Sequence, residues 1–157
     1  MYKKILVPHA GTPADDDALK HAVHTAKSSK AEILILHLVE NVPSAPLGFA
    51  LHTSQVDSIK RQLKEVTRDM KAVMQKEMSK RVQFCKKNKI KAELKVTSGN
   101  TADEILKIVR NQRIDLIVMA KRRKLKGIKR IMTLGSVSRK ILEHVSCPVL
   151  IIDAEKK

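Results

Sequence analysis

A Gly-Ser pair near the end of the chain, Gly135–Ser136, could hold a phosphate group. The pair opens a helical pattern, and the free N–H groups and dipole of a helix N-terminus form a ready anion site. Gly135 has no side chain, so a phosphate can approach the backbone closely, and Ser136 can add a hydroxyl group. The alternative is that the pair only caps the helix. The pattern therefore predicts a candidate anion site, with a simple cap as the alternative.

A run of basic residues, 121–130, precedes this pair and contains seven Lys or Arg side chains. These side chains could grip phosphates by charge, or they could form a solvated loop. The whole chain has a net charge of +16, which favours partners such as a nucleotide, nucleic acid or an anionic surface, but also suits a lysine-rich soluble protein. Aromatic residues make up only 2% of the chain, so stacking platforms for single-stranded nucleic acid are not expected.

Other catalytic or metal-binding patterns are weak. Cys85 and Cys147 match no metal spacing, and the pair His21 and His24 has no third ligand nearby in the sequence. Hydrolysis of a phosphate would need acidic groups to hold a metal, and residues 121–134 contain none. We therefore expect no catalytic residues, no metal site and no enzymatic activity.

Alternating strand and helix patterns position these candidates. Several apolar runs are continuous and branched, which is typical of parallel strands buried on both faces by helices. The expected strands are 4–8, 32–39, 92–97, 115–120 and 148–153. The expected helices are 13–29, 53–88, 101–112 and one that opens at 135–136. This order predicts one α/β domain, residues 1–157, whose ligands sit beyond the carboxyl ends of the strands.

Local signals also mark the helices. Thr12 followed by proline predicts an N-cap, and Thr101 with Glu104 predicts a capping box. Acidic residues 15–17 are expected inside the first helix rather than at the end of the strand, and His9 at that strand end is the histidine nearest the ligand edge. One face of the long helix is predicted to pack on the core, through Ile59, Leu63, Val66, Met70, Val73, Met74, Met78 and Val82.

The first residues lack a signal-peptide core, and no apolar run is long enough for a membrane span. Two cysteines far apart do not form a disulfide framework. We therefore expect a cytoplasmic protein.

Four segments together resemble the universal stress protein family over essentially the whole chain. They are "YKKILVPHAGTPADDDALKHAVHTA", "ILHLV", "DLIVMA" and "LGSVSRKILEHVSCPVLII". The resemblance implies a doubly wound, Rossmann-like, five-stranded parallel sheet of order 3-2-1-4-5 with helices on both faces. It also implies a homodimer formed through the last strand, 148–153.

Many members of that family bind ATP or another adenine nucleotide, and the resemblance carries a nucleotide site onto this chain. The implied site residues are Pro8, Leu38, Gly127, Gly135, Ser136 and Val137. Two features depart from the family pattern. Ala10 stands where an aspartate usually follows the first strand. The leading glycines of the loop are replaced by Arg122 and Leu125 when counted back from Gly135, or by Ala120 and Arg123 when aligned on the strand before the loop. We expect binding of ATP or AMP to be weakened or altered. Lost backbone contacts could be replaced by the charges of Lys121, Arg122, Arg123 and Lys124, or these residues could form a solvated loop.

The resulting hypothesis is a non-enzymatic universal stress protein, a regulator or sensor with a residual or altered nucleotide or phosphate site. An alternative is a basic module that binds nucleic acid or another polyanion without nucleotide. A third, an adenine-nucleotide hydrolase, follows only from relatives of the same fold.

Overall fold

The structure is a computed structural model that describes residues 1–39, 53–121 and 134–153. Within these ranges, five parallel strands form one sheet with the order β3-β2-β1-β4-β5. The strands are β1 Lys4–Pro8, β2 Glu32–Val39, β3 Ala92–Ser98, β4 Leu116–Ala120 and β5 Val149–Ile152. The helices are α1 Pro13–Ser29, α2 Thr53–Lys87, α3 Thr101–Gln112 and α4 Ser136–His144. The predicted fold class, sheet order and element order are confirmed.

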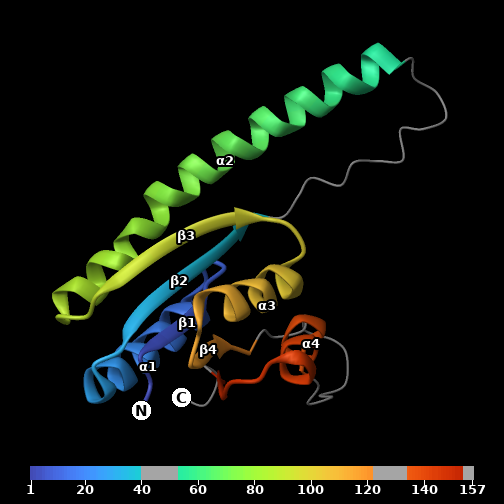
Figure 1. The fold of residues 1–157 in the computed structure, drawn as a ribbon. Coiled ribbons are helices and arrows are strands. Elements are labelled where there is room, and N and C mark those ends of the chain that lie inside the picture. The colour runs from blue at the N-terminus through green and yellow to red at the C-terminus, as the bar shows by residue number, and fades with distance from the viewer. Residues whose placement is uncertain (40–52, 122–133, 154–157) are drawn as a thin grey trace, which may run out of the picture.

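Helices cover both faces of the sheet (Figure 1). Successive residues of each strand point to opposite faces, so every strand contributes side chains to both layers. Ile5, Val7 and Ile33 pack in one buried cluster with α1 and the end of α2. Leu6 and Leu34 face the other way, into a second buried cluster that includes residues of α3 and α4. A continuous apolar run in one strand therefore supplies side chains to both buried clusters.

The start of α1 is as predicted, whereas the predicted cap of α3 is wrong. Thr12 caps α1, and its side chain and that of Asp15 form a capping box. For α3, the cap is Asn100, whose side chain accepts a hydrogen bond from the backbone N–H of Asp103 at 3.2 Å. Thr101 already lies within the helix. An Asn at the preceding position offers an equally good acceptor, so the helix begins one residue earlier than a Thr cap requires.

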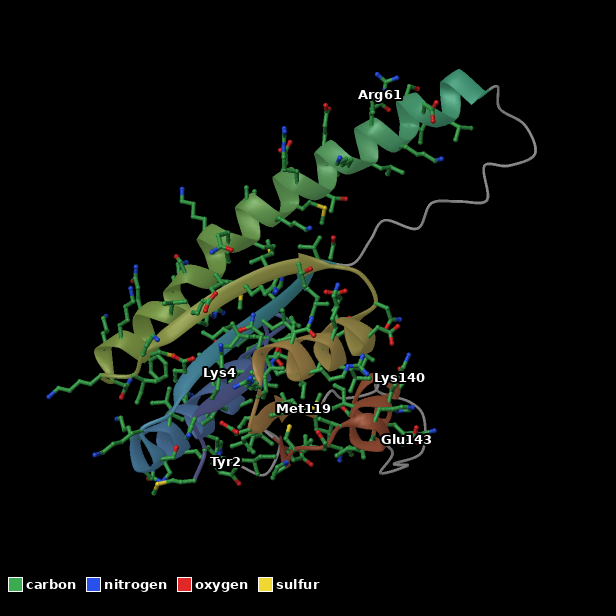
Figure 2. All side chains as sticks on the ribbon, viewed as in Figure 1. Tyr2, Lys4, Arg61, Met119, Lys140 and Glu143 are labelled. Atoms are coloured by element: carbon green, nitrogen blue, oxygen red, sulfur yellow. The ribbon has the colours of Figure 1, made fainter. Side chains whose placement is uncertain are left out.

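The prediction that one face of α2 packs on the core is only partly correct. Met78 is buried, but Val66, Met70 and Val73 are 49%, 42% and 61% exposed. Figures 1 and 2 show the reason: the first half of α2, around Arg61, extends beyond the sheet. A helix of 35 residues is about 50 Å long, far longer than the strands it could cover. The periodicity of apolar residues identified the apolar face of α2, but it did not predict how much of that face packs on the sheet.

No helix among the described residues is long and apolar enough to cross a membrane.

Candidate functional site

A cavity of about 210 Å³ lies at the carboxyl edge of the sheet, between the ends of β1 and β4. The strand order reverses between these strands, which is where α/β sheets usually bind ligands. Five of the six predicted site residues line it: Pro8, Leu38, Gly135, Ser136 and Val137. The sixth, Gly127, lies outside the described residues, as do Arg122 and Lys124. The topology thus brings together residues from both ends of the chain.

One wall of the cavity is apolar. Leu36 and Leu38 come from β2, Met119 from β4 and Ile105 from the first turns of α3. Leu36 and Ile105 are completely buried, so their side chains are fixed by the core. Met119 belongs to the buried cluster that includes Ile141 of α4. These side chains offer a rigid apolar surface that suits a flat, weakly polar group.

The opposite wall is the N-terminus of α4. Gly135 occupies the N-cap position with φ −61° and ψ 160°, and no side chain caps the helix. The first backbone N–H groups of an α-helix have no partner within the helix. A Cβ atom added at Gly135 would meet nothing within 4 Å, so the glycine leaves open space beside these donors. This wall can receive an anionic group.

Asp15 gives the cavity a carboxylate that was not expected from the sequence. It belongs to the first turn of α1, but its Oδ2 accepts hydrogen bonds from Ala10 N at 3.0 Å, Thr12 N at 3.2 Å and Thr12 Oγ1 at 2.7 Å. Asp15 lies inside α1, as predicted, but its side chain reaches back to the loop after β1. The capping box is the signal that could have revealed this, because an acidic N3 residue reaches back to the cap. Oδ1 of Asp15 accepts no hydrogen bond from the described residues.

His9 anchors the loop between β1 and α1. Its Nδ1 accepts a hydrogen bond from Gly11 N at 3.0 Å, so the ring proton lies on Nε2, which donates to Asp16 Oδ1 at 3.0 Å. Burial lowers the pKa of His9, although Asp15 and Asp16 oppose this effect. His37 donates from Nδ1 to the backbone carbonyl of His9 at 2.8 Å. The neutral imidazole of His9 therefore acts as a structural hydrogen-bonding group.

Arg81 of α2 connects to the first turn of α1 on the same face of the sheet. Its Nε and Nη2 donate to the two carboxylate oxygens of Asp16, at 3.0 and 3.3 Å. Partial burial alone would raise the pKa of Asp16, but the hydrogen bonds and charge of Arg81, with those of His9, lower it overall. The hydrogen bond to Asp16 raises the pKa of Arg81. The resulting His9–Asp16–Arg81 network ties His9, which lines the cavity, to α2.

Several sequence candidates lie elsewhere. Lys121, the first residue of the basic run, forms an ion pair with Asp153 at 3.4 Å. His21 and His24 are exposed on α1, and no group of three or more metal-ligating side chains occurs among the described residues. Cys147 is partly buried, and burial raises its pKa.

Comparison with known proteins gives a consistent family assignment. Residues 1–153 match the sequence model of the Universal stress protein family. The universal stress protein YxiE of Bacillus subtilis is 33% identical over 157 residues, which span 97% of this chain and 99% of YxiE. The universal stress protein MJ0531 of Methanocaldococcus jannaschii is 28% identical and covers all of this chain, which matches 85% of that protein.

Solved structures agree with the fold. The structure of MJ0577, a hypothetical protein from M. jannaschii, superposes with a TM-score of 0.79 at 23% identity, covering 100% of this chain and 99% of that one. A universal stress protein from Arabidopsis thaliana, solved with AMP bound, gives a TM-score of 0.61 at 20% identity, covering 98% of this chain and 93% of that one. A universal stress protein in complex with cAMP gives 0.66 at 17%, with 97% of each chain covered.

Proposed function

Because the chain belongs to the universal stress protein family, we propose that it binds an adenine mononucleotide in the cavity at the carboxyl edge and acts as a small, non-enzymatic cytoplasmic regulator or sensor. The observation that carries this proposal is the pairing of an apolar wall with the uncapped N-terminus of α4 across one cavity. A nucleotide has the matching parts, namely a flat base and an anionic phosphate.

The apolar wall would hold the base. Leu38 is partly exposed at this wall, whereas Leu36 and Met119, which also line the cavity, are buried. Apolar pockets with a few polar groups are the usual form of small-molecule sites, commonly with volumes of about 300–1,000 Å³. The cavity of about 210 Å³ is small on this scale, which favours AMP or ATP over a dinucleotide.

The N-terminus of α4 would hold the phosphate. Backbone N–H groups and the helix dipole attract an anion there, and the open space at Gly135 lets it approach. Ser136 is exposed and can donate its hydroxyl proton. These contacts to the phosphate come from α4 itself and do not require the leading loop glycines that this sequence lacks.

Asp15 would take the role that Ala10 cannot. The carboxylate lines the cavity and is linked to Ala10 N at 3.0 Å, so an acceptor stands beside the position where the family usually has an aspartate. We assign Oδ1 of Asp15 as acceptor for a ribose hydroxyl group. The site is therefore altered, with its acceptor moved from the strand end to the first turn of α1.

A regulator fits these residues better than a hydrolase. Asp15 is the only carboxylate among the described residues that line the cavity, and its Oδ2 already receives three hydrogen bonds. Hydrolysis of a nucleotide needs positioned metal ions and an oriented water molecule. One engaged carboxylate is a poor basis for that chemistry.

We also propose a homodimer formed through β5. This strand is at the edge of the sheet, and its Leu150 is 39% exposed. An apolar edge strand with free backbone groups readily pairs with another chain. Light scattering at known concentration is expected to give twice the mass of the chain, and Leu150→Lys is expected to give a monomer.

Thermal unfolding with added nucleotide tests the main proposal. AMP or ATP at 100 times its dissociation constant should stabilise the protein by about 2.7 kcal/mol, seen as a higher melting temperature. Asp15→Asn should reduce this increase in melting temperature. Because the substitution also destabilises the protein itself, the melting temperature of the variant without nucleotide is the reference. If no adenine nucleotide shifts the melting temperature at millimolar concentration, the nucleotide proposal fails and the polyanion-binding alternative stands.

A further inference from the structure

A second hollow lies at the opposite, amino edge of the sheet and is strongly basic. It measures about 1160 Å³ and is formed by the starts of the strands and the ends of three helices. Eight cationic and two anionic side chains line it, a formal excess of six positive charges. We call this surface the basic basin. We propose that it binds the phosphodiester backbone of double-stranded nucleic acid without reading the base sequence.

The basin remains positive after the helices are taken into account. The C-termini of α1, α2 and α3 all lie there, and each carries about half a negative charge, roughly 1.5 in total. Some of the lysines can be explained by these helix ends alone, because a cation near a helix C-terminus stabilises the helix. They offset only about a quarter of the excess, so the surplus is available to an external anion.

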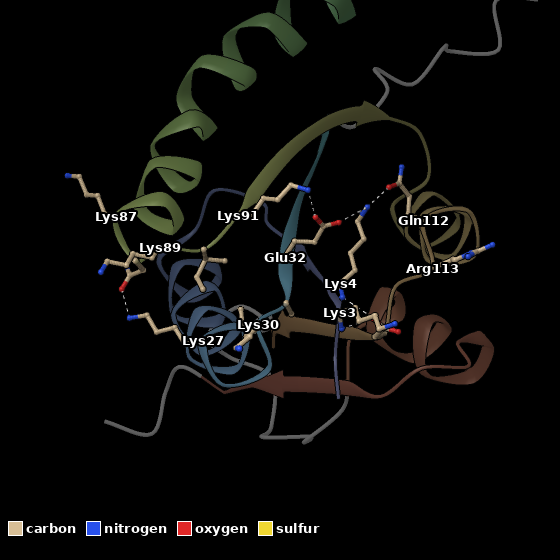
Figure 3. Close-up of a pocket in the computed structure, with 15 residues that line it drawn as sticks. Lys3, Lys4, Lys27, Lys30, Glu32, Lys87, Lys89, Lys91, Gln112 and Arg113 are labelled. Carbon is tan, nitrogen blue, oxygen red and sulfur yellow. Dashed lines mark hydrogen bonds and ion pairs between the residues drawn. The ribbon is translucent and has the colours of Figure 1, made fainter.

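Among the described residues, no ion pair or side-chain hydrogen bond is formed by Lys30, Lys87, Lys89 or Arg113. Lys27 donates to Oδ1 of Asn88 at 2.7 Å, and the charge of Lys3 helps to lower the pKa of Asp115. Figure 3 shows the lysines near α1 and the end of α2, and Arg113 on the opposite side near α3. Other cations are already engaged. Lys4 and Lys91 both pair with Glu32, at 3.5 and 2.8 Å. The unpaired cations therefore surround a centre in which charge is largely balanced.

Three of these unpaired cations adopt a backbone conformation that side chains disfavour. Lys30, Lys89 and Arg113 have φ values of 58°, 61° and 52°, and they are the only non-glycine residues with positive φ in the described chain. Each follows the end of a helix, where glycine is the usual residue. The left-handed conformation costs L-residues about 1 kcal/mol. Strain of this kind often marks functional positions, and here it coincides with charge at all three.

The lining selects double-stranded nucleic acid among anionic partners. No aromatic side chain is present to stack unpaired bases. Seven of the eight cations are lysines, which act as mobile point charges on phosphates and lack the rigid fork of Arg. The apolar residues Ala26, Ala31 and Ile90 give little to insert into a membrane, and a hollow fits a convex ligand better than a flat one. A regular row of phosphates on a duplex matches this surface.

Fluorescence anisotropy with the full chain tests the proposal. Two 20-base-pair duplexes of unrelated sequence are expected to bind equally. The triple variant Lys30→Gly, Lys89→Gly, Arg113→Gly should lose at least about tenfold in affinity at 50 mM KCl. The slope of log K against log salt concentration should become shallower by up to about 2.7, from three lost phosphate contacts. Its melting temperature should equal or exceed that of the wild type, because glycine relieves the strained conformation.

A matched control removes three charges elsewhere. Lys60→Gln, Lys64→Gln, Lys76→Gln on α2 gives the same net charge, and none of these residues lines the basin. This control should keep the wild-type affinity and slope. An equal loss in both variants would mean that net charge alone binds the duplex, and would overturn the proposal.

Two further measurements identify the partner. Poly-glutamate of equal charge should bind at least about tenfold more weakly than the duplex, and equal binding would assign the basin to acidic proteins instead. Saturating AMP should leave duplex affinity unchanged, because the basin and the cavity lie at opposite edges of the sheet. Competition by AMP would place duplex binding in the cavity and overturn the proposal. The triple variant, its control and the poly-glutamate comparison test the basin whether or not AMP binds.

Discussion

The two edges of the parallel sheet present opposite ends of the helices. At the carboxyl edge, the N-terminus of α4 faces a small cavity with an apolar wall. At the amino edge, three helix C-termini face a wide hollow lined with lysines. Backbone dipoles thus favour an anion at the first edge and disfavour it at the second.

This difference determines what each edge can recognise. At the carboxyl edge, fixed N–H groups and a fixed wall can select one small ligand, because position and shape both matter. At the amino edge, an anion must be held by side-chain charge alone. Flexible lysines can hold a row of phosphates but cannot read fine detail. The comparison therefore predicts selective nucleotide binding at one edge and salt-sensitive, sequence-independent binding at the other.

Salt should separate the two edges most strongly. Between 50 and 200 mM KCl, duplex affinity is expected to fall on the order of 10²-fold, because several counterions return to the phosphates. The affinity for AMP should change by less than about tenfold, since a closed cavity is screened less than an open surface. Titrations by anisotropy and calorimetry measure both. Equal salt dependence would contradict the distinction between a cavity and a charged surface.

Gly135→Ala should damage only the carboxyl edge. The backbone at Gly135 suits any residue, and an added Cβ meets nothing within 4 Å, so the free energy of unfolding should stay within about 0.5 kcal/mol of the wild type. The methyl group would occupy the approach to the N-terminus of α4. We expect AMP affinity to fall about tenfold, with duplex affinity unchanged. Unchanged AMP affinity would show that the phosphate does not bind there.

Acid should destabilise the protein through His9, which lines the cavity. Burial lowers the pKa of His9 below its ordinary value of 6.5, so the unfolded chain binds more protons between that value and the lowered one. The contribution of neutral His9 is complete above pH 6.5 and declines as the pH falls, by at most about 1.4 kcal/mol per pH unit. Urea unfolding at pH 7 and pH 5 measures this. His9→Asn should flatten the dependence, whereas His21→Asn, on the exposed face of α1, should not.

Arg81→Met should give the smallest effect. It removes two hydrogen bonds to Asp16 and longer contacts with Glu77 at 3.4 Å. The Asp16 carboxylate is 40% exposed, so water replaces part of the loss. We expect the free energy of unfolding to fall by about 1 kcal/mol in urea. Lys80→Met, which removes a neighbouring exposed ion pair with Glu77, should change it by less than about 0.5 kcal/mol. Equal losses would show that the Asp16 contact adds nothing beyond a surface charge pair.

Local patterns were sufficient to predict the elements of this protein. Branched apolar runs identified β1, β4 and β5, because a strand buried on both faces needs apolar residues at every position. The structure buries β1 and β4 in this way, whereas β5 at the edge is only partly buried. Thr12 before a proline identified the start of α1. The sheet order and the grouping of Pro8, Leu38 and Gly135 came from the family resemblance, and the structure confirms the order and places these residues around one cavity.

Other features depend on contacts between distant segments. The exposed stretch of α2 follows from the length of the helix relative to the sheet, which periodicity does not measure. Asp16 reaches Arg81 across 65 positions, so no local pattern reveals the pair. The basic basin is the clearest case, since Lys30, Lys89 and Arg113 stand far apart in the sequence.

The sequence by itself determined where strands and helices form, because backbone preference and burial on one or two faces act over a few residues. It also contained a local sign of the basin, a basic residue after each of three helices where glycine is usual. Only the tertiary structure decided that these three ends meet at one edge and that the Asp15 carboxylate lines the cavity beside Ala10. Parallel crossovers bring all helix C-termini to the amino edge, and that convergence is a property of the whole sheet.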